Sequence, residues 1–312
     1  MIEQLLGELK GIRGKKILLQ VPEGLKHKVD AIVDCLKGQN NEVYVDIDPC
    51  FGACDVRDRE AQMLGVDLLV HVGHTPLPHV HTVVPVKYVE LRLPVNIDAV
   101  VRTLSTLEGK IALCSTVQYV HALDSIKKRL PDKIFYKKGR ITKYPGQILG
   151  CDASACDVDA DINVFLGDGV FHAIAMYLNR KRPTFVVSPN GELRDVTKEC
   201  KRFDKVRIGL KARAYEAEKW GVVVSTKPGQ INMGIAHQIK RASEEIGKRA
   251  DILVCDYFYP EYVRGMPYDV YVFTGCPRVA LDDWKNYDKP VITPTEALEV
   301  IKWAKERHEW KE

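Results

Sequence analysis

Three cysteines stand in short glycine-containing segments that follow stretches of apolar residues. Cys54 lies in FGACD, Cys151 in LGCD and Cys276 in TGCPR. Cysteine thiolates are the usual protein ligands of iron–sulfur clusters. Small residues beside a cluster let backbone N–H groups approach its sulfur atoms, and a proline follows the ligand cysteine in some cluster-binding loops. The pattern predicts that these three cysteines, far apart in the sequence, together hold one iron–sulfur cluster.

The other cysteines leave alternatives open. Cys50 lies four residues before Cys54 and Cys156 five residues after Cys151, so each competes as a ligand, and Cys50 with Cys54 has a spacing that would suit half of a zinc site. Four more cysteines lie within or at the edges of predicted helices and strands, where we expect buried packing residues: Cys35, Cys114, Cys200 and Cys255. The odd total of nine argues against a disulfide framework.

Histidines form a second group in the segment VHVGHTPLPHVH, at His71, His74, His79 and His81. Four imidazoles so close together suggest a transition-metal site. However, a strand end followed by a proline-broken loop favours exposed imidazoles without a metal. His74 is the exception, because it directly follows a predicted strand and is expected at its functional end. We expect Asp168 and His172, in GDGVFH, near the same edge.

Three polar side chains could hold the carboxylate of an amino acid: Lys227, Gln230 and Arg278. Gln230 is predicted at the start of a helix, where a side-chain amide lies beside free backbone N–H groups. Arg278, two residues after Cys276, offers a bidentate contact, although pairing with Asp282 or Asp283 is an equal alternative. We therefore expect Gln230 and Arg278 to bind the cofactor that carries this carboxylate.

The elements that position these residues alternate between short apolar segments and amphipathic ones. Apolar segments that end in turn residues predict strands at 16–21, 43–47, 66–72, 110–114, 147–149, 162–166, 184–187, 221–224, 252–254 and 270–273. Helices are predicted at 25–36, 195–220 and 229–249. Most strand segments are apolar throughout, as in parallel sheets covered on both faces. The alternation indicates an α/β fold.

The arrangement repeats three times. Segments 15–24, 109–122 and 220–230 each look like the first strand, turn and helix of a unit. We predict three similar domains, each a small parallel sheet flanked by helices: 1–95 with Cys54, 96–197 with Cys151 and 198–312 with Cys276. Ligands of parallel sheets bind beyond the carboxyl ends of the strands. A pseudo-threefold arrangement would bring the three cysteines to one central cluster.

Composition sets further bounds. The content of 46% hydrophobic and 28% charged residues is that of an ordinary globular protein, and the formal charge of +4 is small for 312 residues. The sequence contains no arginine-rich block, so direct readout of nucleic acid is not predicted. No apolar stretch approaches the roughly 18–20 residues that a membrane span needs. The first residues show no signal peptide, so we expect a cytoplasmic protein.

Together these segments resemble a known family, the archaeal-type diphthamide-synthesis enzymes, or 2-(3-amino-3-carboxypropyl)histidine synthases. The resemblance covers nearly the whole chain and is carried by LQVPEGL, GACD, VGH, LGCD, GDG with FH, and GCPR followed by two aspartates. It implies three α/β domains that each give one cysteine to a [4Fe–4S] cluster, and a homodimer. By motif the ligands are Cys54, Cys151 and Cys276.

The resemblance also implies an activity. A reduced cluster with one iron open would cleave S-adenosyl-L-methionine to methylthioadenosine and a 3-amino-3-carboxypropyl radical, which adds to C2 of a histidine of translation elongation factor 2. The reductant protein is not identified by it. Two alternatives stay open from the residues: a Lewis-acid enzyme with a three-cysteine cluster of the quinolinate synthase type, and a non-enzymatic metal-binding partner subunit.

Overall fold

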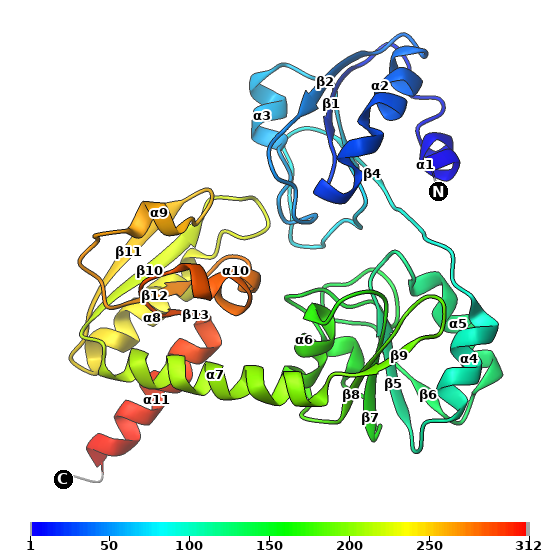
Figure 1. Cartoon of the computed structure of the whole chain (residues 1–312). Helices are drawn as coiled ribbons and strands as arrows, with labels where there is room; N and C mark the ends of the chain where they lie inside the picture. The colour runs from blue at the N-terminus through cyan, green and yellow to red at the C-terminus, as the bar shows by residue number, and fades with distance from the viewer. Residues whose placement is uncertain (1, 310–312) are drawn as a thin grey trace. The chain divides into compact units, whose positions relative to one another are not determined.

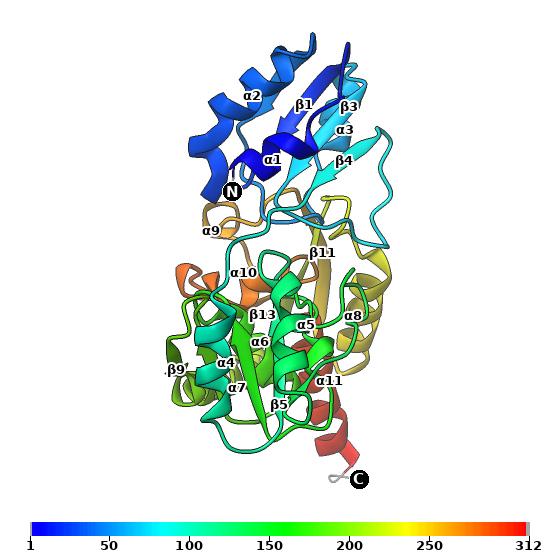
Figure 2. The same ribbon diagram turned by 90° about the vertical axis from the view of Figure 1, so that its right-hand side faces the viewer.

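A computed structural model describes residues 2–309 of the chain. The chain divides into two compact units, Met1–Cys200 and Lys201–Glu312, and each is described by itself. The first unit contains two sheets and the second contains one, and helices cover both faces of every sheet (Figures 1 and 2). Within the described residues, no helix is both long enough and apolar enough to cross a membrane.

The first sheet has the order β2-β1-β3-β4, and all its strands are parallel. In β1, Ile17 and Leu19 pack on one face against the first two helices, whereas Leu18 packs on the opposite face with Ala61 of α3. This is why the strand is apolar throughout. The elements are α1 (Ile2–Glu8), β1 (Lys16–Gln20), η1 (Glu23–Lys28), α2 (Val29–Lys37), β2 (Glu42–Asp46), α3 (Asp58–Met63), β3 (Leu68–Val72) and β4 (Val86–Val89).

The second sheet has the order β6-β5-β7-β8-β9, in which only β9 is antiparallel. Ile111 and Leu113 of β5 pack under α4 and α5, while Ala112 and Cys114 face α6. The elements are α4 (Ile97–Ser105), β5 (Ile111–Ser115), α5 (Val120–Arg129), β6 (Ile134–Phe135), η2 (Ser154–Cys156), β7 (Ile162–Leu166), α6 (Phe171–Asn179), β8 (Thr184–Val187) and β9 (Leu193–Asp195).

The third sheet, in the second unit, has the parallel order β11-β10-β12-β13. Val222 and Val224 of β10 face α8 and α11, and Val223 faces the aromatic residues Phe258 and Tyr271. The elements are α7 (Thr197–Glu216), β10 (Lys219–Ser225), α8 (Met233–Glu245), β11 (Arg249–Cys255), α9 (Pro260–Val263), β12 (Val270–Phe273), α10 (Pro277–Leu281), η3 (Asp283–Asn286), β13 (Val291–Ile292) and α11 (Pro294–Glu309).

The predicted fold class, an α/β fold with three similar small parallel sheets flanked by helices, is confirmed. In each sheet the first strand lies between the second and the third, with the fourth beyond the third. The first strands β1, β5 and β10 are those of the three predicted repeats. The domain boundaries at 95/96 and 197/198 and the arrangement of the domains around a cluster stay predictions.

Two predictions of secondary structure were wrong. Segment 147–149 is not a strand, because Gln147 and Leu149 form only isolated bridges, to Ser115 and Asp152. The helix expected from 229 begins only at Met233, capped by the side chain of Asn232. Four short strands were not predicted: β4, β6, β9 and β13.

Candidate metal centre

The loop that carries Cys54 connects β2 with α3. The N–H of Asp55 donates to the carbonyl of Gly52 at 2.9 Å, so Ala53 and Cys54 form the centre of a four-residue turn. Gln20, the last residue of β1, holds the end of the turn and the segment that follows it. Its Nε2 donates to the carbonyl of Asp55 at 2.7 Å, and its Oε1 accepts the N–H of Arg57 at 3.4 Å. Cys54 itself is partly exposed.

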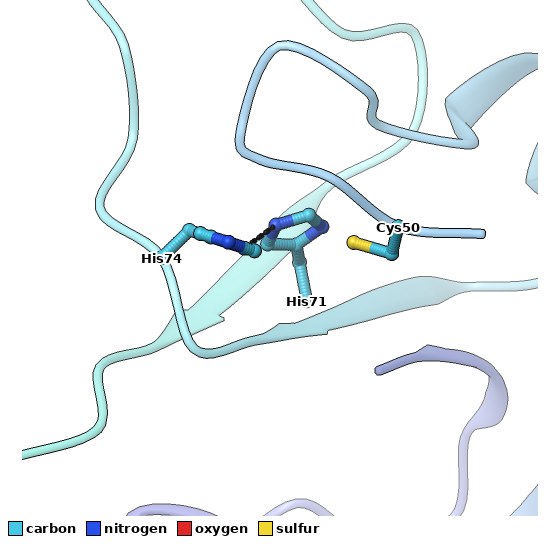
Figure 3. Close-up of side chains that lie close together, drawn as sticks. All are labelled: Cys50, His71 and His74. Carbon is cyan, nitrogen blue, oxygen red and sulfur yellow. Dashed lines mark hydrogen bonds between the residues drawn. The ribbon is translucent and has the colours of Figure 1, made fainter. Parts of the chain in front are cut away.

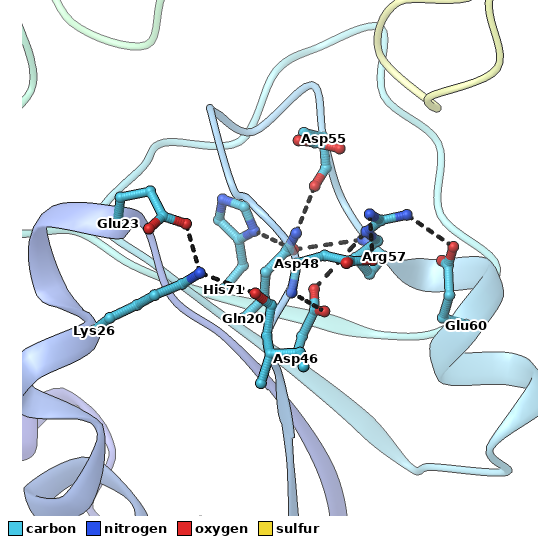
Figure 4. Close-up of polar contacts among 10 residues, drawn as sticks. Gln20, Glu23, Lys26, Asp46, Asp48, Asp55, Arg57, Glu60 and His71 are labelled. Atoms are coloured by element: carbon cyan, nitrogen blue, oxygen red, sulfur yellow. Dashed lines mark hydrogen bonds and ion pairs between the residues drawn. The ribbon is translucent and has the colours of Figure 1, made fainter. Parts of the chain in front are cut away.

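Arg57 anchors the same loop through its charge (Figure 4). Its side chain is 7% exposed and pairs with Asp48 at 2.8 Å, with Glu60 at 3.0 Å and, more distantly, with Asp46 at 3.8 Å. The guanidinium of Arg57 is buried while Asp48 and Glu60 are about half exposed, so loss of these partners would leave a desolvated positive charge. The network ties the start of the loop to α3 and thereby positions Cys54 between them.

Cys151 lies at the tip of a tight turn. The backbones of Leu149 and Asp152 exchange hydrogen bonds of 2.9 and 3.2 Å, which leaves Gly150 and Cys151 at the end of the turn. Burial raises the pKa of the Asp152 carboxylate. It is lowered overall by hydrogen bonds from the Ser154 hydroxyl at 2.5 Å and from the N–H groups of Ile141 and Ser154 at 2.9 and 3.0 Å. The turn is therefore rigid, and its thiol is exposed.

Gly150 packs closely against its neighbour. A Cβ at this position would lie 2.4 Å from the ring of Phe171, the first residue of α6. The bridge between Gln147 and Ser115 brings the segment before the turn to the carboxyl end of β5. Cys151 thus belongs to the end of the sheet where parallel folds bind ligands, as predicted.

Cys276 occupies the N-cap position of α10, shortly after β12, without a capping hydrogen bond from its side chain, and Pro277 lies in the first turn of the helix. Its N–H donates to Oε1 of Gln230 at 3.2 Å. A Cβ on Gly275 would lie 2.7 Å from the ring of Phe273 and 3.0 Å from that same Gln230 oxygen. The glycine before Cys276, like the one before Cys151, is needed for close packing beside the thiol.

The cysteines that are not predicted as cluster ligands are more buried than the three predicted ones or lie in helices and strands. Cys50 is 3% exposed, and burial raises the pKa of its thiol to about 12. Cys156 is fully buried, its pKa is raised mainly by burial, and Asn179 donates to its sulfur at 3.5 Å. Cys114 and Cys200 are buried packing residues, as expected. Cys35 and Cys255 are only partly buried, and burial raises the pKa of Cys255 to about 11.

The histidines divide into two classes. His79 and His81 are exposed, as predicted, but the same expectation for His71 was wrong, because this side chain is completely buried at the end of β3. The turn that follows requires Gly73, which has a φ of +90° and whose Cβ would lie 3.1 Å from Pro22. This turn brings Nδ1 of His74 within 3.0 Å of Nε2 of His71 (Figure 3).

The hydrogen bonds fix how the two imidazoles are protonated. Because the amide group of Gln20 donates to Asp55, its Oε1 is an acceptor and must receive Nδ1–H of His71, at 2.8 Å. Nε2 of a neutral His71 is then an acceptor, so Nδ1–H of His74 is the donor between the rings. Burial lowers the pKa of His71, and it lowers that of His74 to about 4, so both rings are neutral near pH 7.

The histidine pair is connected to the loops of two cysteines. One ligand atom each of Cys50, His71 and His74 lie within 4.8 Å of one another, a group that could hold a metal ion. Thr75, next to His74, accepts a hydrogen bond of 3.0 Å from Gln147, which lies four residues before Cys151. The segment that carries the pair therefore contacts both the loop of Cys54, through Cys50 and Gln20, and the segment before Cys151, through Thr75.

The remaining predicted site residues have clear positions. Oδ2 of Asp168 accepts the Tyr119 hydroxyl at 2.9 Å, and His172 stacks on Phe165 at 5.2 Å. Lys227 is buried, with its ammonium 3.6 Å from the ring centroid of Tyr257. Gln230 lies in the turn before α8, and its N–H bonds to the carbonyl of Lys227, so the expected free N–H at a helix start was wrong.

Arg278 forms the structural pair that its sequence allowed. Its Nε donates to Oδ2 of Asp282 at 2.9 Å, and its side chain is 52% exposed. One further residue of the site was not predicted at all. Gln20 is a polar residue that ends an apolar strand, and this position at the carboxyl edge was the available signal.

The chain is similar in sequence to known proteins over nearly its whole length. The sequence profile of the diphthamide synthesis protein family matches residues 21–312. The chain belongs to this family. It is 32% identical to the 2-(3-amino-3-carboxypropyl)histidine synthase of Pyrococcus horikoshii, over 99% of this chain and 92% of that protein. It is 30% identical to subunit 1 of the human 2-(3-amino-3-carboxypropyl)histidine synthase, over 97% of this chain and 72% of that protein.

A solved structure agrees with this membership in the diphthamide synthesis family. The crystal structure of Dph2 from Pyrococcus horikoshii with a 4Fe-4S cluster matches with a TM-score of 0.86 at 30% identity, covering 96% of this chain and 90% of that one. A second crystal structure of the same protein matches with a TM-score of 0.85.

Proposed function

We propose that this protein is a 2-(3-amino-3-carboxypropyl)histidine synthase, which transfers the 3-amino-3-carboxypropyl group of S-adenosyl-L-methionine to a histidine of a protein substrate. The observation that carries the proposal is the match of nearly the whole chain to the Pyrococcus horikoshii enzyme in sequence and to its cluster-containing structure in fold. This favours the transferase over the Lewis-acid and non-enzymatic alternatives.

The resident cofactor of the proposed enzyme is a [4Fe–4S] cluster on Cys54, Cys151 and Cys276. The residues present suit it, because all three thiols are at least partly exposed on hydrogen-bonded turns or at a helix N-cap. Cys50 and Cys156, in contrast, are buried and have raised pKa values, so their thiolates are disfavoured. When bound, the cluster supplies one electron for reductive cleavage of the Cγ–S bond of S-adenosyl-L-methionine.

The chain's own residues hold the parts in place. Gln20 and Arg57 fix the turn of Cys54, and Asp152 fixes the turn of Cys151. Gln230 binds the N–H of Cys276 through its oxygen, which directs the amide NH₂ group as a donor beside the same cysteine. We assign Gln230 to the binding of the methionine carboxylate. Arg278 contributes to that carboxylate only if its pair with Asp282 opens.

The finer parts of the proposal come from the family resemblance. The protein substrate is translation elongation factor 2, the reaction begins diphthamide biosynthesis, and the enzyme acts as a homodimer in the cytoplasm. None of the nine cysteines, all of which lie within residues 2–309, forms a disulfide, which suits a reducing compartment. Neither a membrane nor direct recognition of nucleic acid enters the mechanism.

The test is an anaerobic reaction of the reconstituted protein with dithionite, S-adenosyl-L-methionine and archaeal elongation factor 2. The proposal expects methylthioadenosine and a histidine that gains the mass of one aminocarboxypropyl group. If the histidine of the elongation factor stays unmodified after full reduction of the cluster, the proposal is overturned.

A further inference from the structure

The buried His71 and the partly buried His74 are not among the proposed cluster ligands, yet several hydrogen bonds hold them in place. Gln20 orients His71, His71 orients His74, and the left-handed turn at Gly73 sets the angle between the rings. Thr75 then ties the pair to the segment before Cys151. Two neutral imidazoles in a fixed order, next to the loops of two proposed cluster ligands, indicate a role in proton handling.

The hydrogen bonds run in a fixed order from His74 through His71 to Gln20, and this order leaves one ring nitrogen of His74 with its lone pair as an acceptor. Nδ1–H of His71 is given to Gln20, and Nδ1–H of His74 is given to Nε2 of His71. Nε2 of His74 is therefore the basic end of the chain of bonds. The lowered pKa of His74, about 4, keeps this nitrogen unprotonated throughout the neutral pH range, so its lone pair is available as a weak base.

The proposed transfer must release a proton. The sulfonium and the neutral imidazole of the target give a C2-substituted imidazole, methylthioadenosine and one proton, with no net oxidation. We propose that His74 is the base that accepts this proton, with Gln20 and His71 as the positioning residues that hold its tautomer. This inference rests on the proposed function of the same site.

The step balances in atoms and electrons. The new bond joins Cγ of the aminocarboxypropyl radical to C2 of the target imidazole, and the C2–H bond of the resulting adduct breaks. The proton goes to Nε2 of His74, and the remaining electron returns to the oxidised iron–sulfur cluster. General-base catalysis by a positioned side chain contributes roughly 10²–10⁴-fold to a rate.

A metal ion on Cys50, His71 and His74 is the competing interpretation of the pair. Both ring nitrogens of His71 are already used, by Gln20 and by His74, and the Cys50 thiol has a pKa of about 12. A metal would have to break the bond between the rings and displace that thiol proton. The hydrogen-bonded arrangement satisfies the same atoms without either change.

The decisive variant is His74→Asn, whose amide NH₂ replaces Nδ1–H as the donor to His71 but offers no basic nitrogen. We expect it to keep wild-type iron content and wild-type formation of methylthioadenosine. The yield of modified elongation factor 2 per methylthioadenosine should fall about 100-fold or more. His79→Ala, at an exposed histidine of the same loop, is the matched control and should behave as wild type.

Two further measurements separate a base from a structural role. With elongation factor 2 deuterated at C2 of its histidines, His74→Asn should show a primary isotope effect larger than that of the wild type, because loss of the C2 proton becomes rate-limiting. In the oxidised wild-type protein labelled with ¹⁵N in histidine, His74 should carry its proton on Nδ1. In Gln20→Leu, which loses the acceptor for His71, this tautomer should no longer dominate.

The outcomes are distinct. Product formation by His74→Asn at the wild-type rate would overturn the inference, and so would parallel loss of methylthioadenosine and product, since that places His74 in cofactor binding. An additional equivalent of zinc or iron that disappears in Cys50→Ser would establish the metal site instead. If the wild type forms no methylthioadenosine, the proposed function itself fails. If His74→Asn loses its cluster, the deuterium isotope effect is measured on His74→Gln instead, and that result decides whether His74 is the base.

Discussion

The backbone N–H of Cys276 donates to the side-chain oxygen of Gln230 at 3.2 Å. This bond joins the ends of β10 and β12, which are neighbouring strands of the third sheet. It gives Gln230 a defined orientation beside a proposed cluster ligand, with its oxygen occupied and its amide NH₂ group as the donor end.

Gln230→Ala should therefore weaken binding of S-adenosyl-L-methionine about tenfold or more, because a hydrogen bond to a charged group contributes roughly 1.5–3 kcal/mol. Gln230→Glu keeps the acceptor for Cys276 but replaces the donor with a carboxylate, so it should weaken binding further. Calorimetric titration of the anaerobic, cluster-loaded variants measures both. If Gln230→Ala and Arg278→Ala both bind with unchanged affinity, the methionine carboxylate is held elsewhere.

Gly150→Ala should destabilise the turn of Cys151. The new Cβ would lie 2.4 Å from the Phe171 ring, and overpacking of this kind costs roughly 1–3 kcal/mol. Gly52→Ala is the matched control near Cys54, because its Cβ would meet the cysteine sulfur at an ordinary 3.6 Å. Thermal unfolding under anaerobic conditions compares the two, and a Gly150→Ala protein as stable as the control would show that Phe171 simply moves aside.

The histidine pair should make the protein lose stability in mild acid. Unfolded histidines take up protons below about pH 6.5, whereas burial holds the folded pKa of His74 near 4 and lowers that of His71 as well. The unfolded state then binds more protons, so this contribution is complete above about pH 6.5 and falls as the pH drops toward 4. Each histidine contributes a slope of about 1.4 kcal/mol per pH unit.

Denaturant unfolding at about pH 7 and pH 5.5 measures this slope. His74→Asn should lose less stability than the wild type between the two values, since one of the two groups no longer titrates. His79→Ala, which changes an exposed imidazole, should keep the wild-type dependence. Equal slopes in wild type and His74→Asn would contradict the burial argument.

Sequence alone was enough for the layers and for the general position of the cysteines. Segments such as KILLQ are apolar on both faces and can only be central strands of covered parallel sheets. Short edge strands such as β6 and β13 were missed because two residues give no periodic pattern. Gln147–Leu149 looked like a strand because its apolar residues pack at the sheet edge without joining the ladder.

Fewer contacts of the site could be predicted from the sequence, because these contacts join residues that are far apart in the chain. The bond between Gln20 and His71 spans 51 residues, so no local pattern could predict it. The clash that requires Gly150 depends on Phe171 in another element. These relationships exist only once the strands have brought their carboxyl ends together.

Alanine variants of single cysteines test the proposed cluster ligands directly. Cys54→Ala, Cys151→Ala and Cys276→Ala should each fail to assemble the cluster, because a [4Fe–4S] cluster with three protein thiolates loses an iron when one is removed. Cys50→Ala and Cys156→Ala should assemble it normally, since both thiols are buried packing residues. Iron and sulfide analysis with the visible absorption spectrum gives the result, and full loading in any of the first three variants would rule out this ligand set.

The central claim is that this chain cleaves S-adenosyl-L-methionine at the Cγ–S bond to transfer the aminocarboxypropyl group. Chromatography of the nucleosides formed by the reduced, cluster-loaded protein tests it most directly. The account predicts methylthioadenosine in amounts that match the modified histidine of elongation factor 2. 5′-Deoxyadenosine as the main nucleoside, with elongation factor 2 unmodified, would contradict it.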